Sequence, residues 1–335
     1  MPMAPRFLWP GTAGPARAIP DRRPGSVRRT VNIDLVRPDG LDGVLVIDAR
    51  GRDLVTLADG TAEEVDRATL RVEVDFVGDR QVLAITSDPP EPALAGLVGG
   101  SSTAGFRSVV TAAVPDHHRS GSLLHQLLDD VPVAVMISGG VLDRNGVRLP
   151  RVGPASLPLI NICAGWVPEG LMARVVAKTG EPGLVGIGPP VPPLASDDVD
   201  AWHDMPPLAP RSMRRRRLLD LAPSADAPDR LAVIGLLRDS YMEPDGFESG
   251  VHEYGFTATV DRRDLVVLEA EATPRVLPGP DCAVAAASAA NLVGRDAGEL
   301  RDWIRQHGGG PATCTHLNDA LRTMGDLGGL AQRLP

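Results

Sequence analysis

The chain repeats part of its own sequence at an offset of 186 residues. The segment SVRRTVNIDL at 26–35 aligns with SMRRRRLLDL at 212–221. Without a gap, thirteen of the fifty positions from 26 to 75 are identical to their counterparts, where composition alone gives roughly four. His125 and His316 lie 191 residues apart, so a few inserted residues shift the later alignment. The sequence therefore predicts two tandem copies of one domain.

Four segments follow from this repeat. We expect a flexible tail at 1–25, a first copy at 26–146, a connector at 147–211 and a second copy at 212–335. The connector contains GIGPPVPPLASDD, a proline-rich composition typical of an extended link. It also contains INICAGW at 160–166, which is too apolar for a free linker. We expect that stretch to insert into an interface.

Each copy has strand patterns first and helix patterns afterwards. In the second copy, 230–237, 251–261 and 263–272 read as strands, with the turn pair Asp245 and Gly246 between the first two. Helices are expected at 282–294, with Asp281 as the cap, then up to the glycines at 308–310, and at 315–330. This order predicts an α+β fold in which an antiparallel meander followed by helices occurs twice, related by a pseudo-two-fold duplication.

Charge and cysteine content exclude several function classes. The net charge of −9 and the pI near 5.3 argue against nucleic-acid and anionic-membrane partners, which require a positive surface. The basic run Arg214–Arg217 is short, and we expect it to be solvated or paired with acidic turns. No segment approaches the ~20 apolar residues of a membrane span. Three cysteines make no disulfide framework, which favours a cytoplasmic location. A small-molecule substrate is expected, and a homodimer is left open.

The segment CTHLNDALRTM at 314–324 places a cysteine, a histidine and an aspartate close together. In a helix, His316 and Asp319 lie three positions apart on one face, so Asp319 could orient the His316 ring. Cys314 can join His316 only from the helix cap, and Cys282 also stands at a predicted helix start, where a thiolate is favoured. We therefore consider Cys282, Cys314 and His316 as ligands of zinc, iron or an iron–sulfur cluster, or as the surroundings of one reactive thiolate.

Cys163 lies in the apolar INICAGW stretch and strengthens the metal hypothesis if it reaches Cys282 and Cys314. The alternative is that each cysteine is a small buried apolar group, as free cysteine often is. No CxxC spacing decides between these interpretations.

The tripeptide HEY at 252–254 supplies candidate acid and base residues. In a strand, His252 and Tyr254 share one face and Glu253 takes the other. The first copy has no such residues at the corresponding positions, so the chemically active groups gather in the second copy. The alternative is that they are half-buried strand residues with satisfied hydrogen bonds. Asp239 is also a candidate, although the recurrence of Arg-Asp at 52–53 and 238–239 favours an ion pair or a turn.

Two resemblances add expectations. The stretch from RRRRLLDL through LLRDS, VHEYGFTATVD, LPGPDC and CTHLNDALR resembles a bacterial family of unknown function whose members end in a GCTHL-type motif. The segment FTATVDRRDLVVLEAEATPRVLPGPDCAVAAASAANLVGRDAGEL is similar to the core of NifU/IscU-type iron–sulfur scaffold proteins. That likeness implies a NifU/IscU-like fold in which Cys282 is a ligand opening a helix and Cys314 or His316 a later one. It departs from the pattern because no cysteine precedes Cys282 on the strands.

The leading hypothesis is an enzyme acting on a small molecule between the second copy and the connector. Cys282, Cys314 and His316 would form a metal or thiolate centre, with Asp319 orienting His316 and with His252, Glu253 or Tyr254 as acid or base. The alternatives are an iron–sulfur or zinc-binding accessory protein and a non-catalytic interaction protein.

Overall fold

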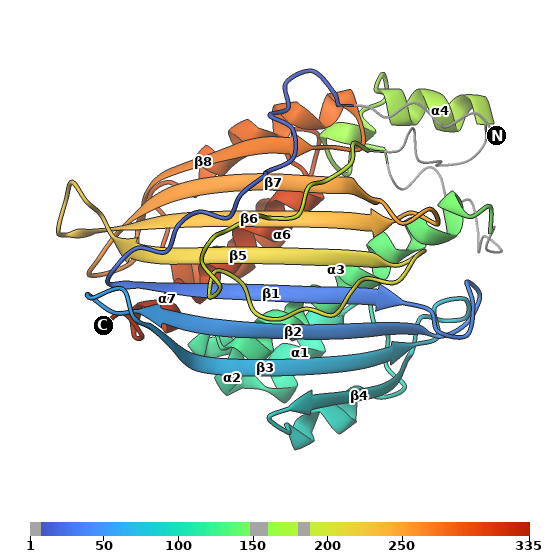
Figure 1. Ribbon diagram of the computed structural model, residues 1–335. Helices are drawn as coiled ribbons and strands as arrows, with labels where there is room; N and C mark the ends of the chain where they lie inside the picture. The colour runs from blue at the N-terminus through green and yellow to red at the C-terminus, as the bar shows by residue number, and fades with distance from the viewer. Residues whose placement is uncertain (1–7, 148–159, 180–187) are drawn as a thin grey trace.

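The computed structural model describes residues 8–147, 160–179 and 188–335, which build an eight-stranded antiparallel sheet covered by helices on one face (Figure 1). The strand order is β4-β3-β2-β1-β5-β6-β7-β8, so two four-stranded meanders meet where β1 pairs with β5. The strands of the first meander are β1 (Ser26–Val36), β2 (Leu45–Thr56), β3 (Ala62–Val74) and β4 (Val82–Asp88). Those of the second are β5 (Met213–Pro223), β6 (Arg230–Met242), β7 (Glu248–Asp261) and β8 (Val267–Val276).

Helices follow the strands in each half and lie behind the sheet as drawn in Figure 1. After β4 come η1 (Pro92–Leu97), α1 (Phe106–Ala113), α2 (Pro115–Ser120) and α3 (Leu123–Arg144). After β8 come η4 (Pro280–Leu292), η5 (Ala297–Glu299), α5 (Leu300–His307), α6 (Thr315–Leu321), η6 (Arg322–Asp326) and α7 (Leu327–Ala331). The α+β class predicted from the order of elements is confirmed. The strands expected at 230–237 and 251–261 fall within β6 and β7, and the one expected at 263–272 overlaps β8, which begins four residues later.

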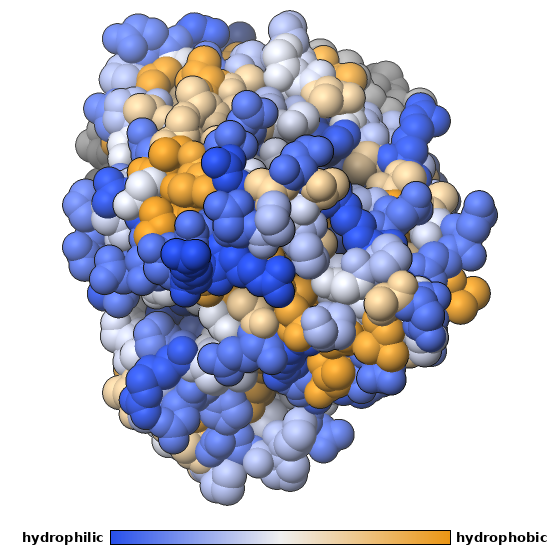
Figure 2. All heavy atoms as spheres, turned by 90° about the vertical axis from the view of Figure 1, so that its left-hand side faces the viewer, coloured by the Kyte–Doolittle hydropathy of each residue, from blue (hydrophilic) through white to orange (hydrophobic). Residues whose placement is uncertain are grey.

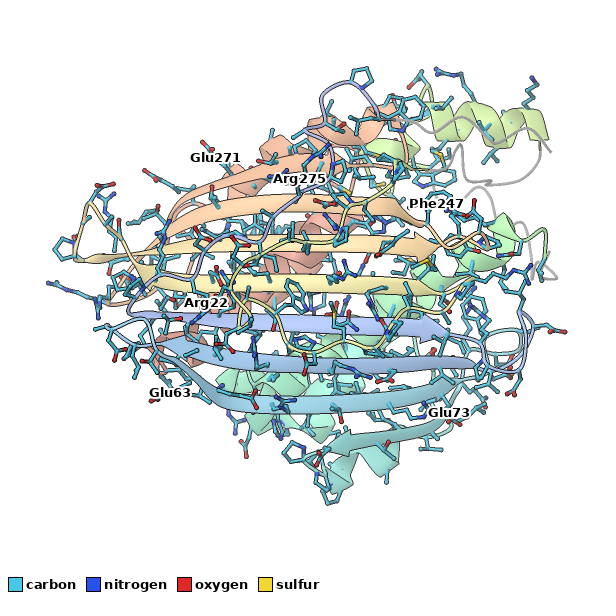
Figure 3. The ribbon with its side chains drawn as sticks, viewed as in Figure 1. Arg22, Glu63, Glu73, Phe247, Glu271 and Arg275 are labelled. Atoms are coloured by element: carbon cyan, nitrogen blue, oxygen red, sulfur yellow. The ribbon has the colours of Figure 1, made fainter. Side chains whose placement is uncertain are left out.

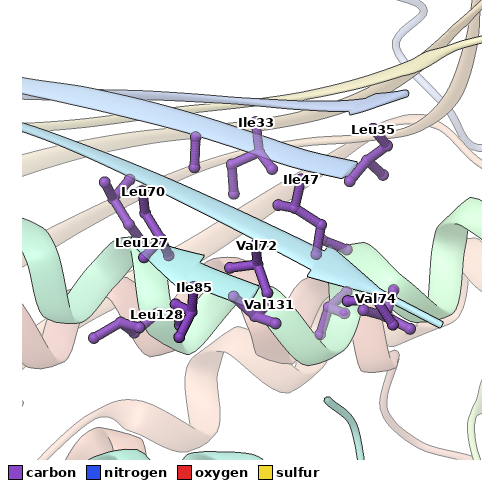
Figure 4. Packing of buried hydrophobic residues seen from close by; sticks show 14 of the residues in the cluster. Ile33, Leu35, Ile47, Leu70, Val72, Val74, Ile85, Leu127, Leu128 and Val131 are labelled. Carbon is purple, nitrogen blue, oxygen red and sulfur yellow. The ribbon is translucent and has the colours of Figure 1, made fainter. Parts of the chain in front are cut away.

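Each meander packs its own hydrophobic core against the helices that follow it. In the first half, Leu127, Leu128 and Val131 of α3 meet the inward side chains of β1–β4 (Figure 4). One prediction for the second half needs correction. The helix expected at 282–294 is a 3₁₀ helix, η4, and Asp281 does not cap it. Its carboxylate accepts instead from the Leu171 N–H at 2.8 Å, at the start of α4 (Leu171–Thr179) in the connector.

Extended segments cover the outer face of the sheet. Residues 8–25 belong to the predicted flexible tail, yet they lie across the strands and form hydrogen bonds, among them Ala13 N–H to Pro274 O at 2.9 Å. Arg22, labelled in Figure 3, is bound in a bidentate pair by Asp198 of the connector at 2.5 and 3.0 Å. Connector residues from 188 onward run beside this segment. The other parts of the predicted tail and connector, 1–7, 148–159 and 180–187, lie outside the described residues.

The basic run Arg214–Arg217 is buried, because β5 is a central strand covered on both faces. Alternation along the strand sends Arg215 and Arg217 to the helix face. There they bind Asp130 of α3 and Asp319 of α6. Arg214 points to the outer face and binds Asp34 of β1 at 2.7 Å. Of the two expectations for this run, solvation was wrong. The run is paired with carboxylates, as the alternative had it, but these stand on strands and helices and not in turns.

Paired contacts recur at the offset seen in the sequence. The β1–β5 ladder is centred on Val31 and Arg217, whose numbers differ by 186. On either side of this centre, Arg28 binds Asp220 and Arg214 binds Asp34, so both donors and both acceptors are related by that offset. Further pairs agree: Arg29–Asp53 matches Arg215–Asp239, and the Arg28 bond to Pro20 O matches that of Arg214 to Pro206 O. The two halves therefore share topology and charge pairing.

Candidate functional site

The site lies on the helix face of β6 and β7, where Asp239 and His252 are cross-strand neighbours. His252 Nδ1 is 3.3 Å from Asp239 Oδ2, and the Asp239 carboxylate accepts from Arg215 at 2.7 and 2.9 Å. Burial by itself raises the pKa of Asp239, but Arg215 and His252 outweigh it and hold that pKa far below its ordinary value. Asp239 is therefore a fixed anion that can orient the His252 ring.

His316 of α6 lies against His252. The two rings are stacked, with centroids 3.4 Å apart and planes inclined by 17°. Burial lowers the pKa of His316 and the neighbouring His252 lowers it further, while Cys314 and Asp239 act in the opposite direction with smaller effect. His316 is therefore neutral at neutral pH and can donate one hydrogen bond through a ring N–H.

Three cysteines from three elements meet beside these rings. Cys163 precedes η3 (Ala164–Trp166) in the connector, Cys282 is in η4, and Cys314 is the residue before α6. All three are buried and all line one cavity. Gly165 lies between two of them, because a Cβ atom placed on it would be 2.7 Å from the Cys282 sulfur and 3.9 Å from the Cys163 sulfur. Cys163 thus lies near the other two cysteines, which was the condition, set from the sequence, for Cys163 to bear on a shared centre.

The surroundings distinguish Cys314 from the other two thiols. Burial raises the pKa of Cys314. The net pKa is nevertheless lowered, because His316 acts on the thiolate through a hydrogen bond and through its charge, and the Tyr254 hydroxyl and the Leu317 N–H add hydrogen bonds. Burial raises the pKa of Cys282 and of Cys163, and the neighbouring sulfurs raise both further. Cys314 is therefore the thiol of the three that most readily ionises.

Tyr254 extends the site along β7. Its hydroxyl is fully buried and has no hydrogen-bond partner of ordinary geometry among the described residues. Burial raises the pKa of Tyr254, and the adjacent Cys314 sulfur raises it further. A phenol that stays protonated beside a thiolate can stabilise the negative charge on its sulfur.

A cavity of about 280 Å³ opens onto His252, His316 and the three cysteines. Its walls come from the end of α3, the connector and the second half, and most of its lining is apolar: Met136, Ile137, Ile162, Trp166, Met172, Met213, Tyr241, Val251 and Pro278. Met136 and Ile162 remain 52% and 42% exposed, which marks an apolar entrance. The site lies toward the end where β6 stops and β7 begins. The opposite end of the molecule, drawn in Figure 2, is mostly hydrophilic.

Two predicted acid–base residues lie elsewhere. Glu253 points to the outer face, where it binds Arg238 at 2.8 Å and accepts from the Ala16 N–H at 2.6 Å. Alternation along β7 separates it from His252 and Tyr254, so its place among catalytic residues is corrected. Asp319 does not serve as the orienting carboxylate of His316, because its oxygens are bound by Arg107, Arg215 and Arg217. Its pKa is about 2, since these arginines outweigh the effect of burial.

In the described part of the chain, one set of three residues brings its donor atoms close enough together to hold a metal ion. The atoms belong to Asp239, His252 and His316 and lie within 4.8 Å of one another; no cysteine sulfur is among them. The predicted ligands Cys163, Cys282, Cys314 and His316 share the cavity, but their binding of a metal stays a prediction.

Some of the site could not be found from sequence. Asp130 of α3 in the first half fixes Arg215, which in turn fixes Asp239, and α3 also supplies a cavity wall. These contacts join residues far apart in the chain. The available signal was the acidic pair Asp129 and Asp130 among the mostly apolar residues of the α3 segment.

Residues 213–328 match the model of a protein family described as a protein of unknown function (DUF2889). The match covers β5 to the start of α7 and supports a family of unknown function for the second half. Comparisons with curated proteins and with solved structures gave no match. The NifU/IscU-like fold therefore stays a prediction. Among the helices of residues 8–147, 160–179 and 188–335, none is both long and apolar enough to cross a membrane.

Proposed function

We propose that the protein is an enzyme that transfers or hydrolyses an acyl group of a small molecule with an apolar body. The observation that carries this proposal is the position of Cys314, the thiol with the lowered pKa, in an apolar cavity beside His316 and the Asp239–His252 pair. A thiolate nucleophile next to an oriented imidazole is the arrangement that acyl transfer requires.

Each group has a distinct task in this scheme. The Cys314 thiolate attacks the acyl carbon, while the His316 N–H and the Tyr254 O–H donate to the negative charge before and during attack. His252, held by Asp239, gives a proton to the leaving group and then takes one from the attacking water or acceptor. Met136 and Ile162 at the entrance favour a substrate that enters with its apolar part first.

A chromogenic ester tests this function. With p-nitrophenyl butyrate, we expect a burst of p-nitrophenol equal to the enzyme concentration, followed by slow turnover. Cys314→Ala should abolish the burst and the acyl mass adduct, whereas Cys282→Ala, a change of an equally buried cysteine in the same cavity, should retain both. A burst that survives Cys314→Ala would refute the proposal.

A metal centre is the second candidate, favoured by the proximity of Asp239, His252 and His316. As placed, these donors fit poorly. A metal lies in the plane of each imidazole ligand, and planes inclined by only 17° meet far outside the rings. Both Asp239 oxygens also accept from Arg215. Metal analysis and a visible spectrum of protein purified without oxygen would decide: stoichiometric zinc, iron or an iron–sulfur band would favour this candidate over the thiolate enzyme.

We further infer that the two halves arose by duplication and that the first became a scaffold. The ion pairs and ladder centre that recur at the offset of 186 support the duplication. In the first half, Asp53 and Asp66 occupy the positions of Asp239 and His252, and Arg333 from the C-terminal segment binds both. An arginine thus neutralises the place that corresponds to the active site. The homodimer, the bacterial origin and the cytoplasmic location stay predictions.

A further inference from the structure

We propose that the same cavity reduces organic hydroperoxides, with Cys314 as the attacking thiol and Cys163 as the thiol that then forms a disulfide with it. This inference rests on the proposed role of Cys314 as the nucleophile. It adds a second reaction to the same site. Acyl transfer needs only one cysteine and does not explain why Cys163 lies beside Cys314.

Contacts of the main chain bring Cys163 and Cys314 side by side. Ala164 N–H donates to Thr313 O at 2.8 Å, and Gly310 N–H donates to Ile162 O at 3.2 Å, so the segments around the two cysteines run along each other. The N–H of Thr315, the residue after Cys314, donates to the Cys163 sulfur. Both cysteines have extended backbones, with φ of −158° and −130°.

The cavity gives both thiols the same access to a ligand. Cys163 and Cys314 each line it, and the mobile thioether groups of Met136, Met172 and Met213 line it with them. An organic hydroperoxide combines an apolar body, which this lining suits, with a polar O–O–H end that can reach the cysteine beside His316. Hydrogen peroxide lacks the apolar part and gains nothing from the walls.

The reaction balances in two steps. The Cys314 thiolate attacks the terminal oxygen, the O–O bond breaks, and the alkoxide takes a proton to leave as an alcohol, so sulfur loses two electrons and the peroxide gains them. Cys163 then loses its proton and attacks the Cys314 sulfenic acid. The S–S bond forms, the S–O bond breaks, and the hydroxide leaves with that proton as water. An external dithiol, such as dithiothreitol, returns the two electrons.

Cumene hydroperoxide added to the reduced full-length chain tests the proposal. We expect one equivalent to consume two thiols, and peptide mapping without reductant to give a Cys163–Cys314 disulfide that dithiothreitol reverses. The rate should exceed that with hydrogen peroxide by about tenfold, the discrimination that an apolar pocket commonly supplies. Cys163→Ser should stop at a sulfenic acid on Cys314 that dimedone traps, whereas Cys282→Ser should still give the Cys163–Cys314 disulfide.

The outcomes separate this inference from the function on which it rests. If the ester burst depends on Cys314 but the peroxide yields no disulfide, or yields one that includes Cys282, the inference is overturned and acyl transfer stands. Should Cys314 react with neither reagent, both proposals fail. A preference for hydrogen peroxide over cumene hydroperoxide would overturn the assignment of the substrate class.

Discussion

Two buried neutral histidines should make folding stability depend steeply on pH. His125 of α3 is 2% exposed and His203 of the connector is 6% exposed. Burial, together with the charge of a nearby arginine, lowers the pKa of each to about 3; the arginine is Arg301 for His125 and Arg52 for His203. In the unfolded chain both return to the ordinary pKa of about 6.5.

The sign and size of the effect follow from these shifts. Because the folded pKa lies below the unfolded one, the contribution to stability is complete above pH 6.5 and is lost as the pH falls toward 3. In that window each histidine lowers the free energy of unfolding by about 1.4 kcal/mol for each pH unit of acidification, so the two together give a slope of about 2.7 kcal/mol per pH unit. Because each imidazole of the unfolded chain is only half protonated at pH 6.5, the slope develops below that pH, and the free energy of unfolding should fall by about 3 kcal/mol between pH 6.5 and 5. His316, whose pKa is also lowered, acts in the same direction.

Urea unfolding followed by tryptophan fluorescence at several pH values between 5 and 8 measures this slope. The lower limit matters, because Asp220 and Asp326 have pKa values raised by burial and act with the opposite sign in more acidic solution. His125→Gln keeps a polar atom toward His118, and His203→Asn keeps one toward Thr30. Each change should reduce the slope by about 1.4 kcal/mol per unit. A double variant with an undiminished slope would refute the reasoning.

Further predictions concern the ion pairs, the site and its packing. Asp34→Asn and Asp220→Asn should each lower the free energy of unfolding by about 3–5 kcal/mol, because each leaves a buried arginine unpaired. If urea titrations gave very different losses for the two variants, the equivalence of the two halves would be contradicted. Asp239→Asn should slow the ester burst by at least about 10²-fold without preventing folding; an unchanged rate in stopped-flow measurements would exclude His252 as the acid and base. Gly165→Ala should cost about 1–3 kcal/mol in thermal or urea unfolding, because its Cβ would lie 2.7 Å from the Cys282 sulfur, and adding Cys282→Ala should restore most of that loss; if it does not, the cost has another source. His316→Phe should move the pH profile of Cys314 alkylation by iodoacetamide to higher pH, because the thiol ionises less readily when its thiolate form loses a hydrogen bond. An unchanged profile would contradict the assigned role of His316.

The strands and the face shared by His252 and Tyr254 could be predicted because both depend on local periodicity. The alternation of a strand fixed which side of β7 each residue faces, and it also separates Glu253 from the site. The spacing of His316 and Asp319 was compatible with a contact between them. That interpretation was wrong because Arg215 and Arg217, which come from β5, bind the carboxylate more strongly.

Burial of the run Arg214–Arg217 could not be predicted from its composition, since a run of four charges is normally solvated. Arg214 and Arg216 are buried because residues 8–25 and the connector, which carry no strand or helix pattern, cover the outer face. Arg215 and Arg217 are buried on the other face, where they bind Asp130 of α3 and Asp319 of α6. The wall that α3 contributes to the cavity is likewise a contact between distant segments. Local patterns thus identified the elements, whereas long-range ion pairs determined which side chains meet.

The seam between β1 and β5 has a consequence for biosynthesis. Arg28 and Asp34 emerge from the ribosome nearly two hundred residues before the partners on β5 that neutralise them. Until then the first meander has a bare edge strand that carries unpaired charges, so it cannot complete its native packing. Translation of the nascent chain must therefore pass β5 before the first half can complete its native packing, so neither half is stable on its own early in synthesis.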